Sequence, residues 1–162
     1  MFGKISIIGC GLIGSSILRA TQEKKLATKI SIYDKSNKVI EYLKKNFTAD
    51  ICSDVSETTK DADLTIISAP LSSYKEILLS IKSTLKEGSI LTDTGSAKKE
   101  VNKIVNNLSL KNISWIASHP IAGTEYSGPA AGFSNLFKNR WCILSADNQV
   151  AKDKIENLEK FW

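Results

Sequence analysis

The 162-residue sequence is poor in the residues that build metal sites, disulfide frameworks and membrane spans. It has one histidine and three cysteines, Cys10, Cys52 and Cys142, which lie far apart without Cys-x-x-Cys spacing. This spacing argues against a disulfide framework or a zinc site, so we expect buried reduced thiols and no metal. No apolar run approaches the roughly 20 residues that span a bilayer, and residues 1–4 lack a signal-peptide layout. We therefore expect a cytoplasmic protein with no membrane partner.

The excess of positive charge is also small. The sequence has 22 Lys and Arg residues and 17 Asp and Glu residues, which gives a net charge of +5. The lysines are dispersed and form no basic stripe interleaved with aromatic residues, so we expect no nucleic-acid partner. A mildly positive field would help to attract an anionic cofactor and substrate. With 42% hydrophobic and 24% charged residues, the chain has the composition of a globular domain, alone or with a fragment of another.

Strand-like and helix-like segments alternate along the chain. The β-branched and apolar runs predict strands at residues 4–9, 29–34, 49–52, 63–68, 89–93, 113–118 and 141–145. Helical spacing predicts helices at residues 12–24, 35–46, 72–86 and 97–108 and from 149 onward, whereas residues 125–133 read as a loop. This alternation predicts an α/β fold of the Rossmann type, with a doubly wound, mostly parallel sheet covered on both faces.

Polar and glycine-rich segments follow the predicted strands. A glycine motif follows the first strand, Asp34 closes the second, Ala69-Pro70 follows the fourth, residues 94–96 follow the fifth, and His119 follows the sixth. In a doubly wound sheet, ligands bind at the carboxyl ends of the strands. We therefore expect these five loops to meet at one edge of the sheet and to form the binding site.

The glycine motif, Gly9–Gly14 (GCGLIG), predicts a dinucleotide site. The first glycine allows a tight turn, the second lets a pyrophosphate approach the backbone, and the third lets helix and strand pack closely. Asp34 lies 20 residues past Gly14, where an acid binds the adenosine ribose. A carboxylate there favours NAD over NADP, although the adjacent Lys35 partly offsets it. The alternatives are a glycine turn used only for packing and an Asp34 that caps the next helix, a role that Ser36 can also fill.

The single histidine, His119, lies between a predicted strand and Pro120. A neutral imidazole can accept a proton from a hydroxyl while hydride leaves, because its ordinary pKa lies near neutral pH. The alternative is a buried structural histidine. The segment from Asp93 to Lys98 also follows a strand; there Ser96 can cap the next helix, orient a substrate oxygen, or both, and Lys98 is a site residue or a solvated helix residue.

The segment His119-Pro120-Ile121-Ala122-Gly123-Thr124-Glu125, followed by Ser127-Gly128, resembles the prephenate/arogenate dehydrogenase family of tyrosine biosynthesis. The segments Gly9–Ser16 and Asp93–Lys98 occur in that family's order and at close to its spacing. The resemblance covers essentially the whole chain, as the family's N-terminal nucleotide-binding domain.

The resemblance implies NAD-dependent oxidative decarboxylation of prephenate to 4-hydroxyphenylpyruvate. It implies that His119 acts on the ring 4-hydroxyl, that Ser96 hydrogen-bonds the same region, and that Thr124 and Glu125 lie near the substrate. It assigns to the cofactor the residues Gly9, Gly11, Leu12, Ile13, Gly14 and Gly95, with Asp34 at the ribose and Ala69-Pro70 on the adenosine side.

The chain departs from the family in length. Family members carry a C-terminal helical domain that forms the homodimer and supplies cationic groups for the substrate, and only Arg19 and Arg140 are arginines here. We expect a nucleotide-binding domain over residues 1–148 and, over 149–162, the start of a helix linking to the absent domain. The terminal Phe161-Trp162 fits such a cut or a helix that packs on a partner. We expect the chain to bind NAD but to turn over poorly alone.

Three alternatives stay open. One is an arogenate-preferring enzyme with the same fold and histidine. Another is a dehydrogenase of the β-hydroxyacid type, against which the His119 segment speaks, because those enzymes use a lysine in a later helical domain. The last is a non-catalytic NAD-binding sensor.

Overall fold

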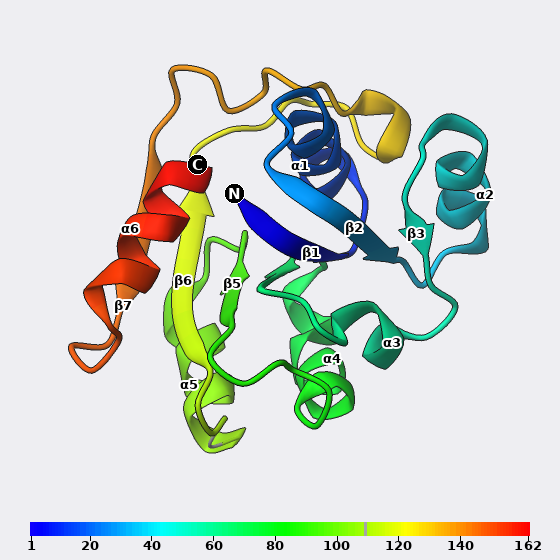
Figure 1. Cartoon of the computed structure of the whole chain (residues 1–162). Helices are drawn as coiled ribbons and strands as arrows, with labels where there is room; N and C mark the ends of the chain where they lie inside the picture. The colour runs from blue at the N-terminus through cyan, green and yellow to red at the C-terminus, as the bar shows by residue number, and fades with distance from the viewer. Residues whose placement is uncertain (109) are drawn as a thin grey trace.

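The computed structural model describes residues 1–108 and 110–162, in which a seven-stranded sheet has helices on both faces (Figure 1). The strands are β1 (Phe2–Ile8), β2 (Ala27–Tyr33), β3 (Asp50–Ile51), β4 (Leu64–Ile67), β5 (Ile90–Asp93), β6 (Ser114–Pro120) and β7 (Cys142–Ala146). The α-helices are α1 (Leu12–Glu23), α2 (Asn37–Asn46), α3 (Val55–Thr59), α4 (Tyr74–Ile81), α5 (Lys98–Leu108) and α6 (Lys152–Phe161), and the 3₁₀ turns are η1 (Leu71–Ser73) and η2 (Pro129–Ala131).

The strand order is β3-β2-β1-β4-β5-β6-β7, and the first six strands in sequence are parallel. The order reverses between β1 and β4, which is the switch point where doubly wound sheets bind ligands. The predicted α/β fold of the Rossmann type is therefore confirmed. Strand β7 pairs antiparallel with β6, with Ile143 opposite His119. Between these two strands the described chain forms the short turn η2 and no α-helix, whereas a parallel pair usually needs a helical crossover.

Two apolar cores, one on each face of the sheet, hold the helices in place. Neighbouring residues of one strand serve different cores, because successive side chains point to opposite faces. Thus Ile7 belongs to the core under α1 and α6, and Ile8 to the core under α4 and α5. Both side chains are at most 1% exposed. Burial on both faces explains why the strands read as continuous apolar runs rather than as alternating ones.

Helix α6 begins at Lys152 and completes the first core. Leu158 is fully buried. The Phe161 ring packs edge-on against Phe2, with ring centroids 6.1 Å apart, and the Trp162 ring lies 5.5 Å from that of Phe137. The aromatic end of the chain therefore packs on its own domain. The role of this helix as a link to a further domain stays a prediction.

Three local features differ from the sequence-based expectation. Helix α3 was not predicted, although Asp54 caps it by accepting a hydrogen bond from the Ser56 N–H at 2.6 Å. Helix α4 is shorter than predicted at both ends. Strand β6 continues through His119 to Pro120, because β7 pairs with its last residues. Among the described residues, no helix has both the length and the apolar character to cross a membrane.

Candidate functional site

A cavity of about 540 Å³ lies at the carboxyl ends of β1, β2, β4 and β5. It brings together segments that are far apart in sequence, as the alternation of strands and loops predicted. Of the predicted cofactor residues, those that line it are Gly9, Gly11, Leu12, Ile13, Asp34, Ala69, Pro70 and Gly95. Gly14 does not line the cavity and is buried behind the turn.

The three glycines of the turn have different surroundings. Gly9 has a positive φ of 87°, and a Cβ there would lie 2.6 Å from the Ser68 carbonyl oxygen. A Cβ on Gly14 would lie 2.1 Å from the Gly9 carbonyl oxygen, whereas one on Gly11 would meet no atom within 4 Å. Gly9 and Gly14 are thus required by packing, and Gly11 leaves open space. Helix α1 starts at Leu12, so the N–H groups of its first turn lack intrahelical acceptors and can hold an anion.

The Asp34 carboxylate connects the glycine turn to the segment that follows β2. One oxygen, Oδ2, accepts the Cys10 N–H at 2.7 Å, and Oδ1 accepts the Ser36 N–H at 2.8 Å. Ser36 occupies the N-cap position of α2, but its side chain makes no capping hydrogen bond. Neither side chain therefore caps α2: the Asp34 carboxylate accepts the Cys10 and Ser36 N–H groups, and the Ser36 side chain makes no capping hydrogen bond. Lys35 lines the same cavity.

The far wall of the cavity was missed by sequence reasoning. It consists of Val55 in α3 and of residues from η1 and α4, namely Ser73, Glu76, Ile77 and Ser80. The last four are spaced as i, i+3, i+4 and i+7, which places them on one helical face. This spacing was a usable signal, but the apolar stripe of the same helix, which faces the core, is the stronger pattern.

His119 lies near the end of β6 and is half-buried. Because side chains alternate along a strand, it shares a face with Trp115, whose Nε1 donates to Asn102 of α5 at 2.9 Å. His119 does not line the nucleotide cavity, and neither does Ser96, although its neighbour Gly95 does. The structure therefore places His119 and Ser96 beyond the rim of the cavity, on the carboxyl side of β5 and β6.

The predicted substrate residues Thr124 and Glu125 are exposed and lie outside the nucleotide cavity. The Thr124 hydroxyl accepts the Tyr126 N–H at 3.2 Å. Thr124 lines a separate hollow of about 460 Å³ together with Arg140. This hollow places one of the two arginines beside the loop that the sequence assigned to the substrate.

A fully buried carboxylate, Asp93, joins the segments around His119. Its Oδ1 accepts from Lys98 Nζ at 2.6 Å and from the Ser118 N–H at 3.2 Å. Its Oδ2 accepts from the Gly95 N–H at 3.0 Å and from the Tyr74 hydroxyl at 3.3 Å. Burial, followed by the neighbouring Asp93 charge, raises the pKa of Tyr74. The carboxylate thus ties the loop of Ser96 to the strand of His119.

Lys98 is part of this network and not a solvated helix residue. Its side chain is 21% exposed, and Nζ also donates to the Ser118 carbonyl oxygen. Burial lowers the pKa of Lys98, although its hydrogen bond to Asp93 opposes this effect. Ser118 is therefore held at both its N–H and its C=O, directly before His119. Helix α5 begins at Lys98, two residues after Ser96. The capping role of Ser96 stays a prediction.

All three thiols are free, but only Cys10 is buried, whereas Cys52 and Cys142 are half-buried. Burial, and then the nearby Asp34, raises the pKa of Cys10 to about 12. Burial likewise raises the pKa of Cys142 to about 11. Both thiols therefore stay protonated near neutral pH and are poor nucleophiles.

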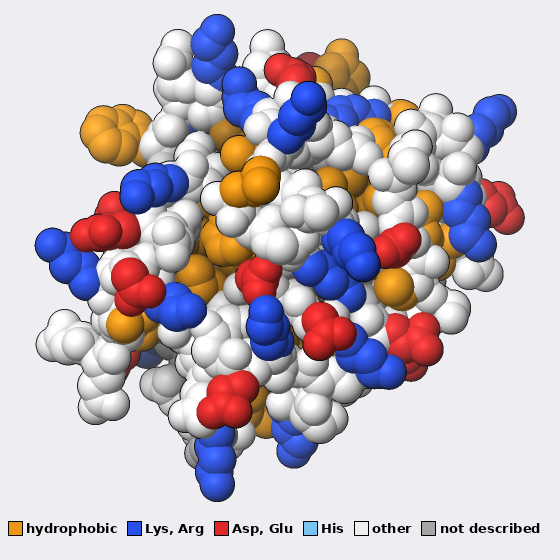
Figure 2. Space-filling view, in the orientation of Figure 1, with side chains coloured by type: hydrophobic (Ala, Val, Ile, Leu, Met, Phe, Trp, Pro, Cys, Tyr) orange, Lys and Arg blue, Asp and Glu red, His pale blue; other side chains and the backbone are white. Residues whose placement is uncertain are grey.

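Positive charge does not gather on the face that carries α6 (Figures 1 and 2). Figure 2 shows Lys and Arg side chains there spread among acidic ones. This distribution agrees with the dispersed lysines of the sequence.

Comparison with known proteins identifies the family. Residues 17–162 match the family model described as "Prephenate dehydrogenase, nucleotide-binding domain". The chain is 35% identical over 163 residues to a cyclohexadienyl dehydrogenase of Zymomonas mobilis, covering 100% of this chain and 55% of that protein. It is 34% identical over 158 residues to a prephenate dehydrogenase of Lactococcus lactis, covering 96% and 44%. The chain thus spans about half the length of these relatives.

Solved structures share the fold. The prephenate dehydrogenase of A. aeolicus in complex with hydroxyphenyl propionate and NAD+ superposes with a TM-score of 0.86 at 24% identity, covering 100% of this chain and 57% of that one. The arogenate dehydrogenase of Synechocystis also gives a TM-score of 0.86, at 21% identity, covering 98% and 55%. The family resemblance that the motifs predicted is confirmed: the chain belongs to the family of prephenate dehydrogenase nucleotide-binding domains.

Proposed function

We propose that this chain is the nucleotide-binding part of an NAD-dependent prephenate dehydrogenase, which converts prephenate to 4-hydroxyphenylpyruvate in tyrosine biosynthesis. One observation carries the proposal: the glycine turn, Asp34 and the loop after β5 line one cavity at the switch point of the sheet. The strand that carries His119 lies next to β5, and the Asp93 carboxylate joins the two.

The residues that line the cavity fit a dinucleotide. Gly11 presents open space where a side chain would otherwise stand, and the first turn of α1 offers N–H groups to a pyrophosphate. Asp34 retains acceptor capacity for ribose hydroxyls beyond its two backbone hydrogen bonds, because an ionised carboxylate has about four lone-pair sites. Ala69, Pro70 and the face of α4 enclose the adenosine side. NAD, when bound there, supplies the hydride acceptor.

We further propose that His119 takes the proton of the substrate ring hydroxyl, and that Ser96 orients that hydroxyl. The network of Asp93 and Lys98 holds the backbone on either side of these residues. Thr124 and Arg140 line one hollow, and in this proposal that hollow and the neighbouring Glu125 form the approach to the substrate. In this proposal, the part of the longer relatives beyond this chain supplies the remaining substrate contacts and forms a homodimer in the cytoplasm.

Substrate choice between prephenate and arogenate belongs to the same proposal, since one structural neighbour is described as an arogenate dehydrogenase. The two acids differ in the side chain opposite the ring hydroxyl. In this proposal His119 and Ser96 act on the ring hydroxyl, which both substrates share. Prephenate is the preferred proposal because the matching family model and two curated relatives carry its name.

Calorimetric titration of the purified chain tests the proposal. We expect NAD to bind, NADP to bind more weakly, and prephenate to bind detectably only after NAD is present. Arogenate in place of prephenate decides the substrate question. NAD binding without any prephenate effect would assign substrate recognition to residues outside this chain. Absence of nucleotide binding would contradict the proposed role of the glycine turn.

A further inference from the structure

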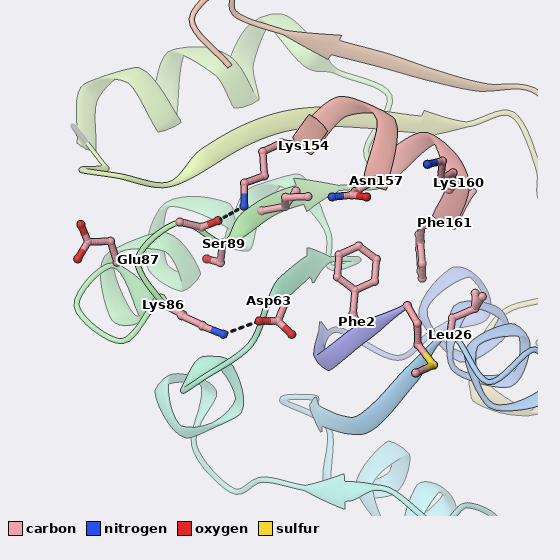
Figure 3. A pocket seen from close by; sticks show the side chains of 13 residues that line it. Phe2, Leu26, Asp63, Lys86, Glu87, Ser89, Lys154, Asn157, Lys160 and Phe161 are labelled. Atoms are coloured by element: carbon pink, nitrogen blue, oxygen red, sulfur yellow. Dashed lines mark hydrogen bonds and ion pairs between the residues drawn. The ribbon is translucent and has the colours of Figure 1, made fainter. Parts of the chain in front are cut away.

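A second cavity, of about 480 Å³, lies at the opposite edge of the sheet, where β1 and β5 begin (Figure 3). It shares no lining residue with the nucleotide cavity. Its size falls within the range of about 300–1,000 Å³ that is typical of small-ligand sites. The proposed dehydrogenase chemistry does not use it.

The negative charges at this cavity are already compensated or directed elsewhere. Asp63 Oδ1 accepts from Lys86 Nζ at 2.5 Å, and Oδ2 accepts the N–H groups of Gly3 at 2.7 Å and Lys4 at 3.1 Å. The Glu87 side chain points away from the cavity (Figure 3) and accepts from Asn112 Nδ2 at 2.6 Å. Neither carboxylate therefore repels an anion strongly.

Helix α6 adds positive charge to the cavity wall. Lys154, Asn157 and Lys160 project from it along one side of the cavity (Figure 3). Lys154 Nζ donates to the Gly88 carbonyl oxygen at 2.6 Å and keeps two further N–H groups. Within the described residues, neither Lys154 nor Lys160 forms an ion pair. Two ammonium groups and an amide are thus available to an anionic ligand.

The floor of the cavity is apolar and aromatic. The rings of Phe2 and Phe161 meet edge-on with their centroids 6.1 Å apart, and Leu26 and Ile90 extend this surface. Ser89, which is only 3% exposed, also lines the cavity, and its hydroxyl has no hydrogen-bond partner among the described residues.

We propose that this cavity is a second binding site, for a small organic anion that carries an aromatic ring or another flat apolar group. The acid group lies against Lys154, Asn157 and Lys160. The apolar group lies on Phe2 and Phe161. A purely inorganic anion leaves this aromatic floor exposed, and a neutral aromatic compound leaves the two ammonium groups without a partner.

The test uses 3-phenylpropionate, titrated into the ¹⁵N-labelled chain and followed by amide NMR shifts. We expect shifts at residues 88–90 and 154–161. Propionate, which lacks the ring, and 3-phenyl-1-propanol, which lacks the charge, are expected to bind at least tenfold more weakly. Shifts confined to the glycine turn or to residues 119–125, or no binding at millimolar concentration, would overturn the proposal.

Variants separate this site from the nucleotide site. We expect the double variant Lys154→Met/Lys160→Met to bind 3-phenylpropionate at least tenfold more weakly than the wild type. Lys152→Met is the matched control, because Lys152 lies on the same helix, is exposed, and does not line the cavity. It and His119→Asn are expected to bind within twofold of the wild type. If the double variant does not fold, the exposed Lys160→Met alone replaces it, with an expected loss of about threefold. Unchanged affinity in the double variant, or in Lys160→Met where it replaces the double variant, would contradict the site.

Discussion

At the scale of single residues, the glycine turn separates a requirement of folding from a requirement of binding. Gly11→Ala adds a methyl group to open space, so we expect the free energy of unfolding to change by less than about 1 kcal/mol. The same methyl group occupies the space that a pyrophosphate needs, so NAD affinity should fall at least tenfold. Denaturant unfolding and calorimetry measure the two effects.

Gly14→Ala provides the contrast. Its methyl group would lie 2.1 Å from the Gly9 carbonyl oxygen, and backbone atoms cannot rotate away. We therefore expect a loss of several kcal/mol in unfolding free energy, as for other overpacked positions, where about 1–3 kcal/mol or more is typical. A Gly11→Ala chain that binds NAD like the wild type would contradict the proposed position of the pyrophosphate.

The buried thiol of Cys10 predicts a pH dependence of stability. Its pKa is raised from 9.0 to about 12, so the unfolded chain releases this proton at a lower pH than the folded chain. The contribution is fully present below pH 9 and is lost as the pH rises toward 12. At pH 10 the loss is about 1 kcal/mol.

Urea unfolding of the wild type and of Cys10→Ala at pH 8 and pH 10 measures this effect. The variant removes the titrating group, so it should lose about 1 kcal/mol less than the wild type between the two pH values. All other titrating groups are common to both chains and cancel in the difference. Equal losses would show that the Cys10 thiol is not the group responsible.

The residues that sequence reasoning found are those that act within a short motif. The glycines and Asp34 occur at fixed spacing, because one turn and one strand determine their geometry. The pair of Asp93 and Lys98 was missed, although both residues were noted, because its meaning depends on Ser118 in a different strand. Likewise, the helical spacing of the Glu76 face of α4 was outweighed by the stronger apolar stripe that faces the core.

At the scale of elements, Asp93 and Lys98 join β5, α5 and β6. Lys98→Met leaves a fully buried carboxylate without its ammonium partner. Removal of one member of a buried pair typically costs about 3–5 kcal/mol, so we expect a loss of this order in unfolding free energy. Asp93→Asn/Lys98→Met removes both charges and should recover part of it. Lys99→Met, at an exposed position on the same helix, is the matched control.

The same variant reports on His119. The chain has one histidine, so its imidazole NMR resonances need no assignment among several. Because Lys98 and Asp93 hold Ser118 at its C=O and N–H, we expect Lys98→Met to move these resonances at constant pH. Lys99→Met should leave them in place. If both variants leave the resonances unchanged, the network does not position His119.

Element type was more predictable than element pairing. All seven predicted strands are present, because apolar β-branched runs identify strands that are buried on both faces. The antiparallel direction of β7 was not predicted, since it depends on the absence of a crossover helix after Pro120. Helix α3 was missed because five residues are too few for a periodic pattern, and only its cap at Asp54 indicates it.

At the scale of the whole molecule, the two edges of the sheet carry different cavities. Strands β1 and β5 begin beside the cationic, aromatic cavity and end at the nucleotide cavity. The sequence predicted the nucleotide cavity, because loops after parallel strands converge on one edge of the sheet. The cationic, aromatic cavity depends on α6 folding back over the starts of β1 and β5, which no local sequence pattern describes.

Ligand linkage gives a prediction for the whole molecule. A ligand that binds only the folded state at 100 times its Kd raises the unfolding free energy by about 2.7 kcal/mol. We expect NAD to raise the unfolding midpoint accordingly, and NADP at the same concentration to raise it less. The reason is that a 2′-phosphate would meet the Asp34 carboxylate, whose charge two backbone N–H groups only partly offset.

Asp34→Asn makes this prediction specific. The amide retains one acceptor oxygen and loses the charge, so the ligand-free variant should be less stable by about 1 kcal/mol. Each chain is therefore compared with its own ligand-free midpoint. The shift with NAD should shrink and the difference between NAD and NADP should narrow, because the repulsion is gone while Lys35 remains in the cavity. An equal NADP shift in the wild type would mean that Asp34 holds the turn together without selecting the nucleotide.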